Sequence, residues 1–222
     1  MQLIVFTDIH GRFDLFANAA EEIREADLVV LAGDITHFGH REQMQHVLEI
    51  LKKMNAGILA VTGNCDHPDA EDCLADNQVS LNRKYCRHGG YGFAGLSGSL
   101  PCPGTTPQEM SEQAYATLLY ELVPAPPAAR TEPVPLILVI HQPPVRTVCD
   151  RVQEGMHVGS TSVRDFIEKR QPLLCICGHI HEGTGIDRIG STLIINPGPF
   201  RSGHYARIRL EGHKAQPELK KL

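Results

Sequence analysis

The stretch MQLIVFTDIHGRFDLFANAAEEIREADLVVLAGD (residues 1–34) is the most informative part of this chain about its fold. It contains two short apolar runs rich in β-branched residues, Leu3–Phe6 and Leu28–Ala32, with a helix-like segment between them. A polar motif follows each run, Asp8-Ile9-His10 after the first and Gly33-Asp34 after the second. Strands that consist of uninterrupted apolar residues are usually buried on both faces of a sheet. The stretch therefore predicts a β-α-β unit with acidic side chains at its strand ends.

The alternation of apolar runs and helix-like segments continues beyond this unit. Residues 42–54 carry apolar side chains at helical spacing, and the next apolar run ends at Gly63-Asn64-Cys65-Asp66. Parallel strands joined by helices carry their ligand chemistry at the carboxyl ends of the strands. The expected strands are 3–6, 28–32, 58–61, 136–140, 173–177 and 193–195, with strand-like pieces around Tyr85 and Tyr91. The expected helices are 13–25, 42–54, 108–123 and 160–171.

Three irregular segments bear on the organisation of the chain. The Pro-rich stretch 124–135 is interpreted as a connector within one domain rather than as a domain boundary. Residues 142–159 lack periodicity and directly follow a candidate ligand, so we expect them to form part of the substrate rim, with a plain surface excursion as the alternative. The sequence thus predicts a single α/β domain over residues 1–210 and a polar, poorly ordered tail over residues 211–222.

Composition argues against several classes of protein. The chain has 222 residues, a net charge of -5 and no basic run, which disfavours broad electrostatic binding of nucleic acid. No apolar stretch reaches the roughly 18–20 residues that span a bilayer, and the chain shows no signal-peptide pattern. The seven cysteines include no Cys-x-x-Cys pair. We therefore expect a cytoplasmic protein that has no disulfide framework and does not associate with membranes.

Five polar motifs, each directly after an apolar run, supply the candidate chemistry. They contribute two carboxylates, one amide and four imidazoles, from Asp8, His10, Asp34, Asn64, His141, His179 and His181. Side chains at i and i+2 of an extended segment point to the same side, so Asp8 with His10, and His179 with His181, would each aim at one cluster. This donor set favours divalent Mn, Fe, Co, Ni or Zn. Two such ions side by side suit the hydrolysis of phosphate esters.

In this order, the motifs Asp-x-His, Gly-Asp, Gly-Asn-x-Asp, a strand-end His and Gly-His-x-His resemble those of the calcineurin-like metallophosphoesterase superfamily. The resemblance extends from Asp8 to His181, and Asn196-Pro197-Gly198 is similar to a turn of the small single-domain members. It implies a four-layer α/β/β/α sandwich, in which two mixed sheets flanked by helices hold two metal ions at one edge. Manganese is the first expectation for both ions. The resemblance assigns one ion to Asp8, His10 and His181. It assigns the other to Asn64, His141 and His179, with Asp34 as the bridge.

The resemblance also implies an activity. We expect the chain to hydrolyse small phosphate esters, phosphodiesters above all, by in-line attack of a metal-bridging hydroxide without a covalent enzyme intermediate. A nuclease or a phosphomonoesterase of the same superfamily is the nearest alternative. A non-catalytic scaffold on this fold is the alternative from another class. A homodimer is compatible with the exposed strand edges of such folds.

The sequence departs from the superfamily at Cys65, where many members carry a histidine that assists the leaving group. A thiol with an ordinary pKa near 8.5 is a poor substitute for an imidazolium acid. Cys65 and Asp66 are the catalytic candidates, and His37 and His67 are the substrate-binding candidates that would replace the missing imidazole. Either the enzyme prefers phosphodiesters or good leaving groups, or one of these histidines acts instead, or Cys65 only packs. Arg201 follows the Asn-Pro-Gly turn and is positioned in the sequence to meet a phosphate oxygen, although a solvated surface position is its simpler interpretation.

Overall fold

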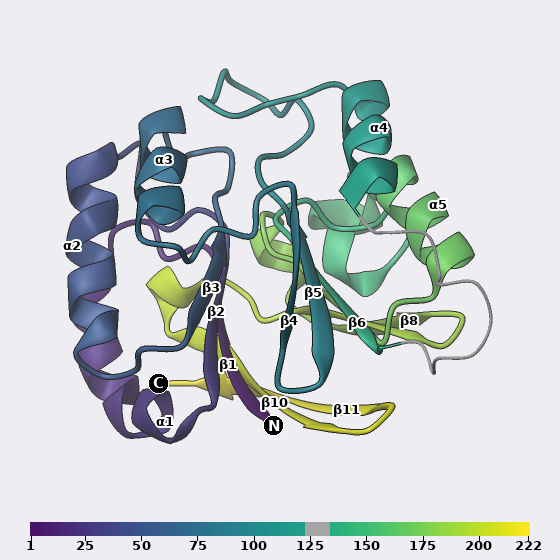
Figure 1. Cartoon of the computed structure of the whole chain (residues 1–222). Coiled ribbons are helices and arrows are strands. Elements are labelled where there is room, and N and C mark those ends of the chain that lie inside the picture. The colour runs from purple at the N-terminus through teal and green to yellow at the C-terminus, as the bar shows by residue number, and fades with distance from the viewer. Residues whose placement is uncertain (123–133) are drawn as a thin grey trace.

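Two mixed β-sheets lie face to face at the centre of the molecule (Figure 1). The structure is a computed structural model that describes residues 1–122 and 134–222. The five-stranded sheet has the order β11 (Lys214–Lys221), β10 (His204–Glu211), β1 (Gln2–Phe6), β2 (Leu28–Ala32) and β3 (Ile58–Val61). The six-stranded sheet has the order β4 (Lys84–His88), β5 (Tyr91–Leu96), β6 (Leu136–Ile140), β7 (Leu174–Ile176), β9 (Thr192–Asn196) and β8 (Gly185–Ile189).

The central strands are apolar throughout because both of their faces are covered. In β1, Leu3 and Val5 pack in the core between the two sheets, whereas Ile4 and Phe6 pack against the helices on the other side. The same alternation holds in β6, where Val139 lies between the sheets and neighbouring side chains face the outer helices. A strand covered on both faces has no position for a polar side chain. Polar residues are therefore displaced to the loops that follow the strands.

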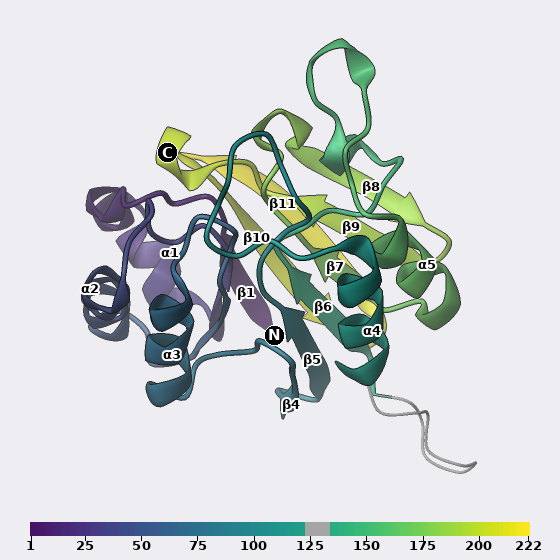
Figure 2. The same cartoon turned by 90° about the horizontal axis from the view of Figure 1, so that it is seen from above.

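The helices form the two outer layers (Figure 1, Figure 2). On the five-stranded sheet lie the 3₁₀ segment η1 (Phe13–Ala19) and the helices α1 (Ala20–Glu25), α2 (Arg41–Lys52) and α3 (Pro68–Asp76). On the six-stranded sheet lie α4 (Glu112–Leu122) and α5 (Thr161–Arg170). This order of helix, sheet, sheet and helix confirms the predicted four-layer α/β/β/α sandwich.

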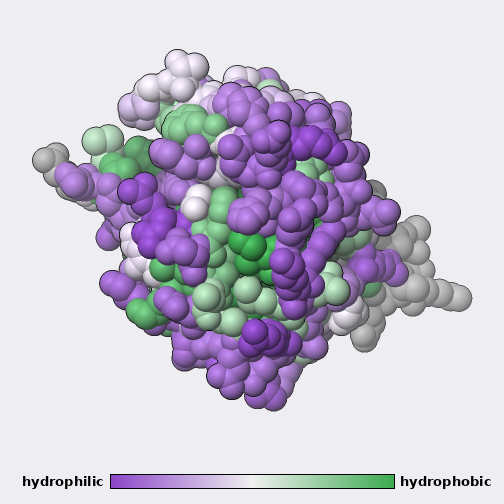
Figure 3. Space-filling view, turned by 90° about the vertical axis from the view of Figure 1, so that its left-hand side faces the viewer, coloured by the Kyte–Doolittle hydropathy of each residue, from purple (hydrophilic) through white to green (hydrophobic). Residues whose placement is uncertain are grey.

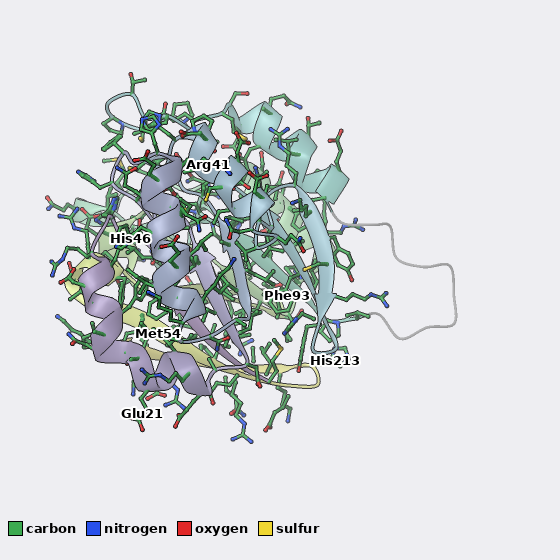
Figure 4. The ribbon with its side chains drawn as sticks, turned by 60° about the vertical axis from the view of Figure 1, so that its left-hand side comes forward. Glu21, Arg41, His46, Met54, Phe93 and His213 are labelled. Atoms are coloured by element: carbon green, nitrogen blue, oxygen red, sulfur yellow. The ribbon has the colours of Figure 1, made fainter. Side chains whose placement is uncertain are left out.

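Helix α2 shows why the outer layer forms where it does. Its apolar side chains, spaced by three or four residues, are buried against the sheet: Met44, Val47, Leu48 and Leu51. The face of the molecule that carries α2 is largely hydrophilic, with a small apolar area near its centre (Figure 3). Arg41 and His46 lie along α2 on this exposed side, whereas Phe93 of β5 lies in the interior (Figure 4).

The structure corrects several sequence predictions. The expected helix over residues 13–25 is divided into η1 and α1. Helix α3 was not predicted, although it starts with Pro68 at its first position and presents Ala70, Cys73 and Leu74 to the core. The expected helix over residues 108–123 starts only at Glu112, and most of the expected Pro-rich connector lies outside the described residues.

The prediction of a poorly ordered tail over residues 211–222 is wrong. Lys214–Lys221 forms the edge strand β11, which pairs antiparallel with β10 along its whole length after a turn at Gly212. An edge strand is held by backbone hydrogen bonds and tolerates polar side chains on its open side. Only Ala215 contributes to the core between the sheets, so composition alone gave no sign of the strand.

The strand directions place the functional loops together. β1, β2 and β3 are mutually parallel, and so are β5, β6, β7 and β9. Their carboxyl ends therefore meet along one edge of the sandwich, the edge that faces the viewer in Figure 2. The strands below this edge are largely buried. The loops above it carry the polar motifs.

Candidate metal centre

All seven predicted metal ligands lie in loops that follow strands. Two of them follow β1 and two follow β7, while one each follows β2, β3 and β6: Asp8, His10, Asp34, Asn64, His141, His179 and His181. Three groups of potential metal-binding side chains form at the sheet edge, each with its ligand atoms within 4.8 Å of one another. The groups are Asp8, His10 and His181, then His10, Asp34 and Cys65, then Asp34, His141 and His179.

The backbone conformation that brings these side chains together differs from the predicted one. Asp8, His10, Asp34 and His179 all have positive φ, between 46° and 69°. They are thus left-handed turn residues rather than members of an extended segment, and His181 begins the 3₁₀ turn η4 (His181–Gly183). The expected i, i+2 geometry is therefore wrong, although both pairs still converge. Non-glycine residues in this conformation are strained and cluster at functional sites.

The first group is compact and centred on one carboxylate. His181 Nε2 lies 3.3 Å from Asp8 Oδ1, and His10 Nε2 lies 3.3 Å from His181 Nε2. Ligand atoms held by one tetrahedral ion at roughly 2.0–2.1 Å are about 3.3 Å apart. Two of the separations match this spacing, and the third, from His10 Nε2 to Asp8 Oδ1, is wider at 4.0 Å, so a shared divalent cation would draw these two side chains closer together.

Asp34 lies between the first group and the remaining ligands. Its Oδ2 atom is 3.7 Å from His10 Nε2 on one side and 3.4 Å from His141 Nε2 on the other. Its Oδ1 atom accepts a hydrogen bond from the backbone N–H of Cys65 at 2.8 Å, which fixes the carboxylate. A carboxylate held between two groups of nitrogen donors has the geometry of a bridging ligand.

Three buried polar atoms of the site residues have no hydrogen-bond partner, namely His10 Nδ1, Asn64 Oδ1 and His141 Nε2, and the last two are good metal donors. Asn64 donates from Nδ2 to the Thr106 hydroxyl at 3.2 Å, which leaves its buried Oδ1 unpartnered. His141 has its Nδ1 atom 2.8 Å from the carbonyl of Ala32, which leaves its buried Nε2 without a hydrogen bond. Leaving such atoms unpaired costs about 1–3 kcal/mol each. The donor set therefore fits two divalent ions.

The charges at the site are strongly coupled. Burial alone would raise the pKa of Asp8 and Asp34, but the neighbouring imidazoles outweigh it and hold both pKa values below their usual range. Burial would lower the pKa of His141, but the Asp34 carboxylate raises it to about 9. Burial and the charge of His141 lower the pKa of His179 to about 4. At neutral pH the carboxylates are therefore ionised and His179 presents a free lone pair.

The ligand loops are held by a further set of contacts. The Thr7 hydroxyl donates to Asp8 at 2.8 Å, and the backbone N–H of His179 donates to the same carboxylate at 3.1 Å. Asn196 donates from Nδ2 to the carbonyl of Ile180 at 2.8 Å, so the Asn-Pro-Gly turn supports the loop that carries His179 and His181. These contacts explain why a turn distant in sequence accompanies the ligand motifs.

Asp66 and Cys65 are buried beside the ligands, and the Cys65 thiol lies within 4.8 Å of ligand atoms of His10 and Asp34. The fully buried Asp66 carboxylate accepts hydrogen bonds from the N–H of Thr36 at 2.7 Å, from the Thr36 hydroxyl at 2.6 Å and from the N–H of Gly63 at 2.9 Å. It thereby ties the Asp34 loop to the Asn64 loop. Burial and the Asp34 carboxylate raise the pKa of Asp66 to about 6 and also raise the pKa of the Cys65 thiol.

The two predicted substrate-binding histidines occupy different places. The His37 ring packs edge-on against His10, with ring centroids 5.6 Å apart, and lines a pocket beside that ligand. His67 instead stacks on His40 at 4.0 Å, at the start of α3. The pocket beside His10 is also lined by Arg12, Arg201 and Ser202. Its lining includes no residue of the expected rim, 142–159.

Several contributing residues were not identified from the sequence. Thr106 lies in a Gly/Pro/Ser loop that gave no periodic signal, and it contacts Asn64 only because residues 42 positions apart meet. Arg12 was not singled out, and for Arg201 a surface position was preferred over a contact with a phosphate oxygen. His46 on α2 and His213 in the turn after β10 (Figure 4) are exposed and belong to none of the metal-binding groups among the described residues.

Similarity to known proteins agrees with this geometry. Residues 1–209 match the calcineurin-like phosphoesterase superfamily domain. An uncharacterized protein of Methanocaldococcus jannaschii is 35% identical over 205 residues, which cover 90% of this chain and 88% of that protein. A Thermus thermophilus protein of known crystal structure aligns with a TM-score of 0.73 at 18% identity, over 98% of this chain and 97% of the other. A structure described as a novel archaeal phosphodiesterase aligns with a TM-score of 0.55 at 15% identity, over 99% and 100%.

The match to this family supports a hydrolase that acts on phosphate esters. The chain belongs to the calcineurin-like phosphoesterase superfamily. Members of this superfamily use divalent metal ions, and the ligand groups described above are this chain's candidates to hold them. Within the described residues, none of the helices has the length and apolar character needed to cross a bilayer.

Proposed function

We propose that this protein is a dinuclear metal-dependent phosphodiesterase. The observation that carries the proposal is the position of Asp34 between two groups of imidazole donors, 3.7 Å from His10 and 3.4 Å from His141. One ion would be held by Asp8, His10 and His181. The other would be held by Asn64, His141 and His179, with Asp34 shared.

The bound ions are expected to contribute two effects. Divalent ions at this site would lower the pKa of a coordinated water towards neutrality and neutralise negative charge on the phosphoryl group. The chain's own residues orient this chemistry, because the N–H of Cys65 fixes Asp34 and the Thr106 hydroxyl turns the amide oxygen of Asn64 towards the site. Asp66 acts as a positioning residue, since its hydrogen bonds join the two loops and it is fully buried.

The substrate preference follows from the absence of an acid at position 65. The Cys65 thiol is nearly buried and its pKa is raised, so it holds its proton at neutral pH and transfers it poorly. His67 stacks on His40 away from the pocket beside His10, so it offers no ready replacement. With no acid at position 65, esters whose leaving group departs unprotonated are favoured, and His37, which lines the pocket beside His10, is the one remaining candidate acid of the two histidines. The fold similarity to an archaeal phosphodiesterase supports the same class of substrate.

The proposal is tested with protein that has been stripped of metal and supplied with Mn²⁺. We expect metal-dependent hydrolysis of bis(p-nitrophenyl) phosphate that exceeds hydrolysis of p-nitrophenyl phosphate. Replacing Cys65 by His is expected to raise monoester turnover relative to diester turnover. Equal or better monoester turnover by the wild type would overturn the diester preference. Absence of turnover with both esters would favour a non-catalytic scaffold.

A nuclease is the less favoured alternative because the net charge of -5 opposes binding of a long polyanion. We also propose that the protein works in a reducing, cytoplasmic compartment. All seven cysteines are free thiols, four of them among the side chains with no exposed surface: Cys73, Cys149, Cys175 and Cys177.

A further inference from the structure

A pocket of about 350 Å³ opens beside the metal ligand His10. Besides His10 it is lined by Arg12, His37, Arg201 and Ser202, which come from three segments far apart in the chain. His10 and Arg12 lie in the loop after β1, and His37 lies in the loop after β2. Arg201 and Ser202 belong to the 3₁₀ turn η5 (Phe200–Ser202). Two arginines in one small pocket stand out in a chain whose net charge is -5. The volume is within the range of small-molecule sites.

Arg201 is anchored to the candidate metal centre through its backbone. Its backbone N–H donates to the carbonyl of Asp8 at 3.1 Å, which joins η5 to the first ligand loop. Its side chain is exposed and lies close enough to His181 to act on it electrostatically. No carboxylate of the described chain lies within ion-pair distance of the Arg201 guanidinium.

Arg12 is less available than Arg201 to bind an anionic ligand. Its guanidinium makes two parallel hydrogen bonds to Asp14, at 2.9 and 3.0 Å, which orient the group and neutralise part of its charge. Because Arg201 has no such partner, it is the group best suited to receive an anion from a ligand. The hydroxyl of Ser202 and the ring of His37 add polar atoms to the same pocket.

We infer that this pocket is a subsite for a second phosphate of the substrate. The inference rests on the proposed function, because it places the scissile ester at the metal centre on one side of His10 and a non-reacting phosphate on the other. The planar guanidinium matches a phosphate group in both shape and charge. The preferred substrates would then be small phosphodiesters that carry an additional phosphate, rather than neutral or singly charged esters.

Two chromogenic esters that share one scissile bond test the subsite. They are the p-nitrophenyl ester of thymidine 5′-phosphate with a free 3′-hydroxyl, and the same ester with a 3′-phosphate. An exposed charge pair at this pocket corresponds to about a fivefold preference. We expect the wild type to show kcat/KM about fivefold higher for the 3′-phosphorylated ester, and Arg201→Gln to bring this ratio close to one. The preference is also expected to shrink at high salt.

Arg87→Gln is the matched control, because it removes the same charge from an exposed position on β4. It should keep the preference of the wild type. Equal kcat/KM for the two esters in the wild type, or an unchanged ratio in Arg201→Gln, would overturn the subsite. Hydrolysis of bis(p-nitrophenyl) phosphate in the same preparation tests the proposed function separately, since this ester has no second phosphate.

A binding measurement keeps the two hypotheses apart if no ester is hydrolysed. Calorimetry with Mn²⁺-loaded protein compares thymidine 3′,5′-bisphosphate with thymidine 5′-phosphate. We expect about fivefold tighter binding of the bisphosphate to the wild type and not to Arg201→Gln. Equal affinities of the wild type for both nucleotides would reject the subsite, whatever the outcome of the turnover assays.

Discussion

Gly63→Ala is expected to displace the Asp34 carboxylate, the proposed bridging ligand. A Cβ atom at this position would lie 2.1 Å from Asp34 Oδ1 and 2.3 Å from the Asp34 backbone nitrogen. These atoms would have to separate by about 1 Å to reach an ordinary contact. A shift of that size in a catalytic group lowers turnover by on the order of 100-fold. Both clashing atoms belong to Asp34, which is buried and hydrogen-bonded, so this residue cannot readily move away from the added methyl group.

Both the stability and the activity of the Gly63→Ala variant are measured. Overpacking of this kind costs about 1–3 kcal/mol, so calorimetry should show a Tm about 2–12 °C below that of the wild type for a chain of this size. Hydrolysis of bis(p-nitrophenyl) phosphate should fall on the order of 100-fold at saturating Mn²⁺. Gly185→Ala on β8 is the control, because its Cβ would meet only Val148, at 3.6 Å. Wild-type turnover by Gly63→Ala would show that close packing of Gly63 on Asp34 does not position the site.

Three further results are expected. Thr106→Val removes the hydroxyl that accepts from Asn64 and should weaken Mn²⁺ binding roughly tenfold in calorimetry, whereas Thr106→Ser should restore it; equal affinities for both variants would reject this role. Asp66→Asn places an amide NH₂ among the donors of Thr36 and Gly63 and should cost about 1–3 kcal/mol, which a Tm within about 1 °C of the wild type would contradict. Free Mn²⁺ at about 100 times its Kd should stabilise the protein by about 2.7 kcal/mol relative to a chelated sample, and identical melting curves would argue against a native metal site.

The parts of the fold that the sequence predicts are those determined by burial. The runs that form β1, β2, β3 and β6 are apolar because both sheet faces are covered, and this pattern is visible in a single sequence. The ligand motifs were found for the same reason, since each follows such a run. In contrast, β11 depends on backbone pairing with β10, and its alternating polar residues resemble those of a disordered tail.

Within the site, residue types are readable from the sequence but backbone conformations are not. Nothing in Asp8 or His179 as residues predicts a positive φ, which arises because the surrounding loops converge on one point. The contact between Thr106 and Asn64 likewise spans 42 residues, and the pocket of Arg12 and Arg201 joins opposite ends of the chain. Such features depend on tertiary structure, so no local pattern could have placed them.

The proposed dinuclear centre is tested most directly by titrating metal-free protein with Mn²⁺ while diester turnover is measured at each ratio of bound ion to chain. With Asp34 shared between the two ligand groups, we predict little turnover with one ion bound and a steep rise as the second ion binds. Full turnover with a single ion, or no rise in turnover when two are bound, would contradict the dinuclear mechanism.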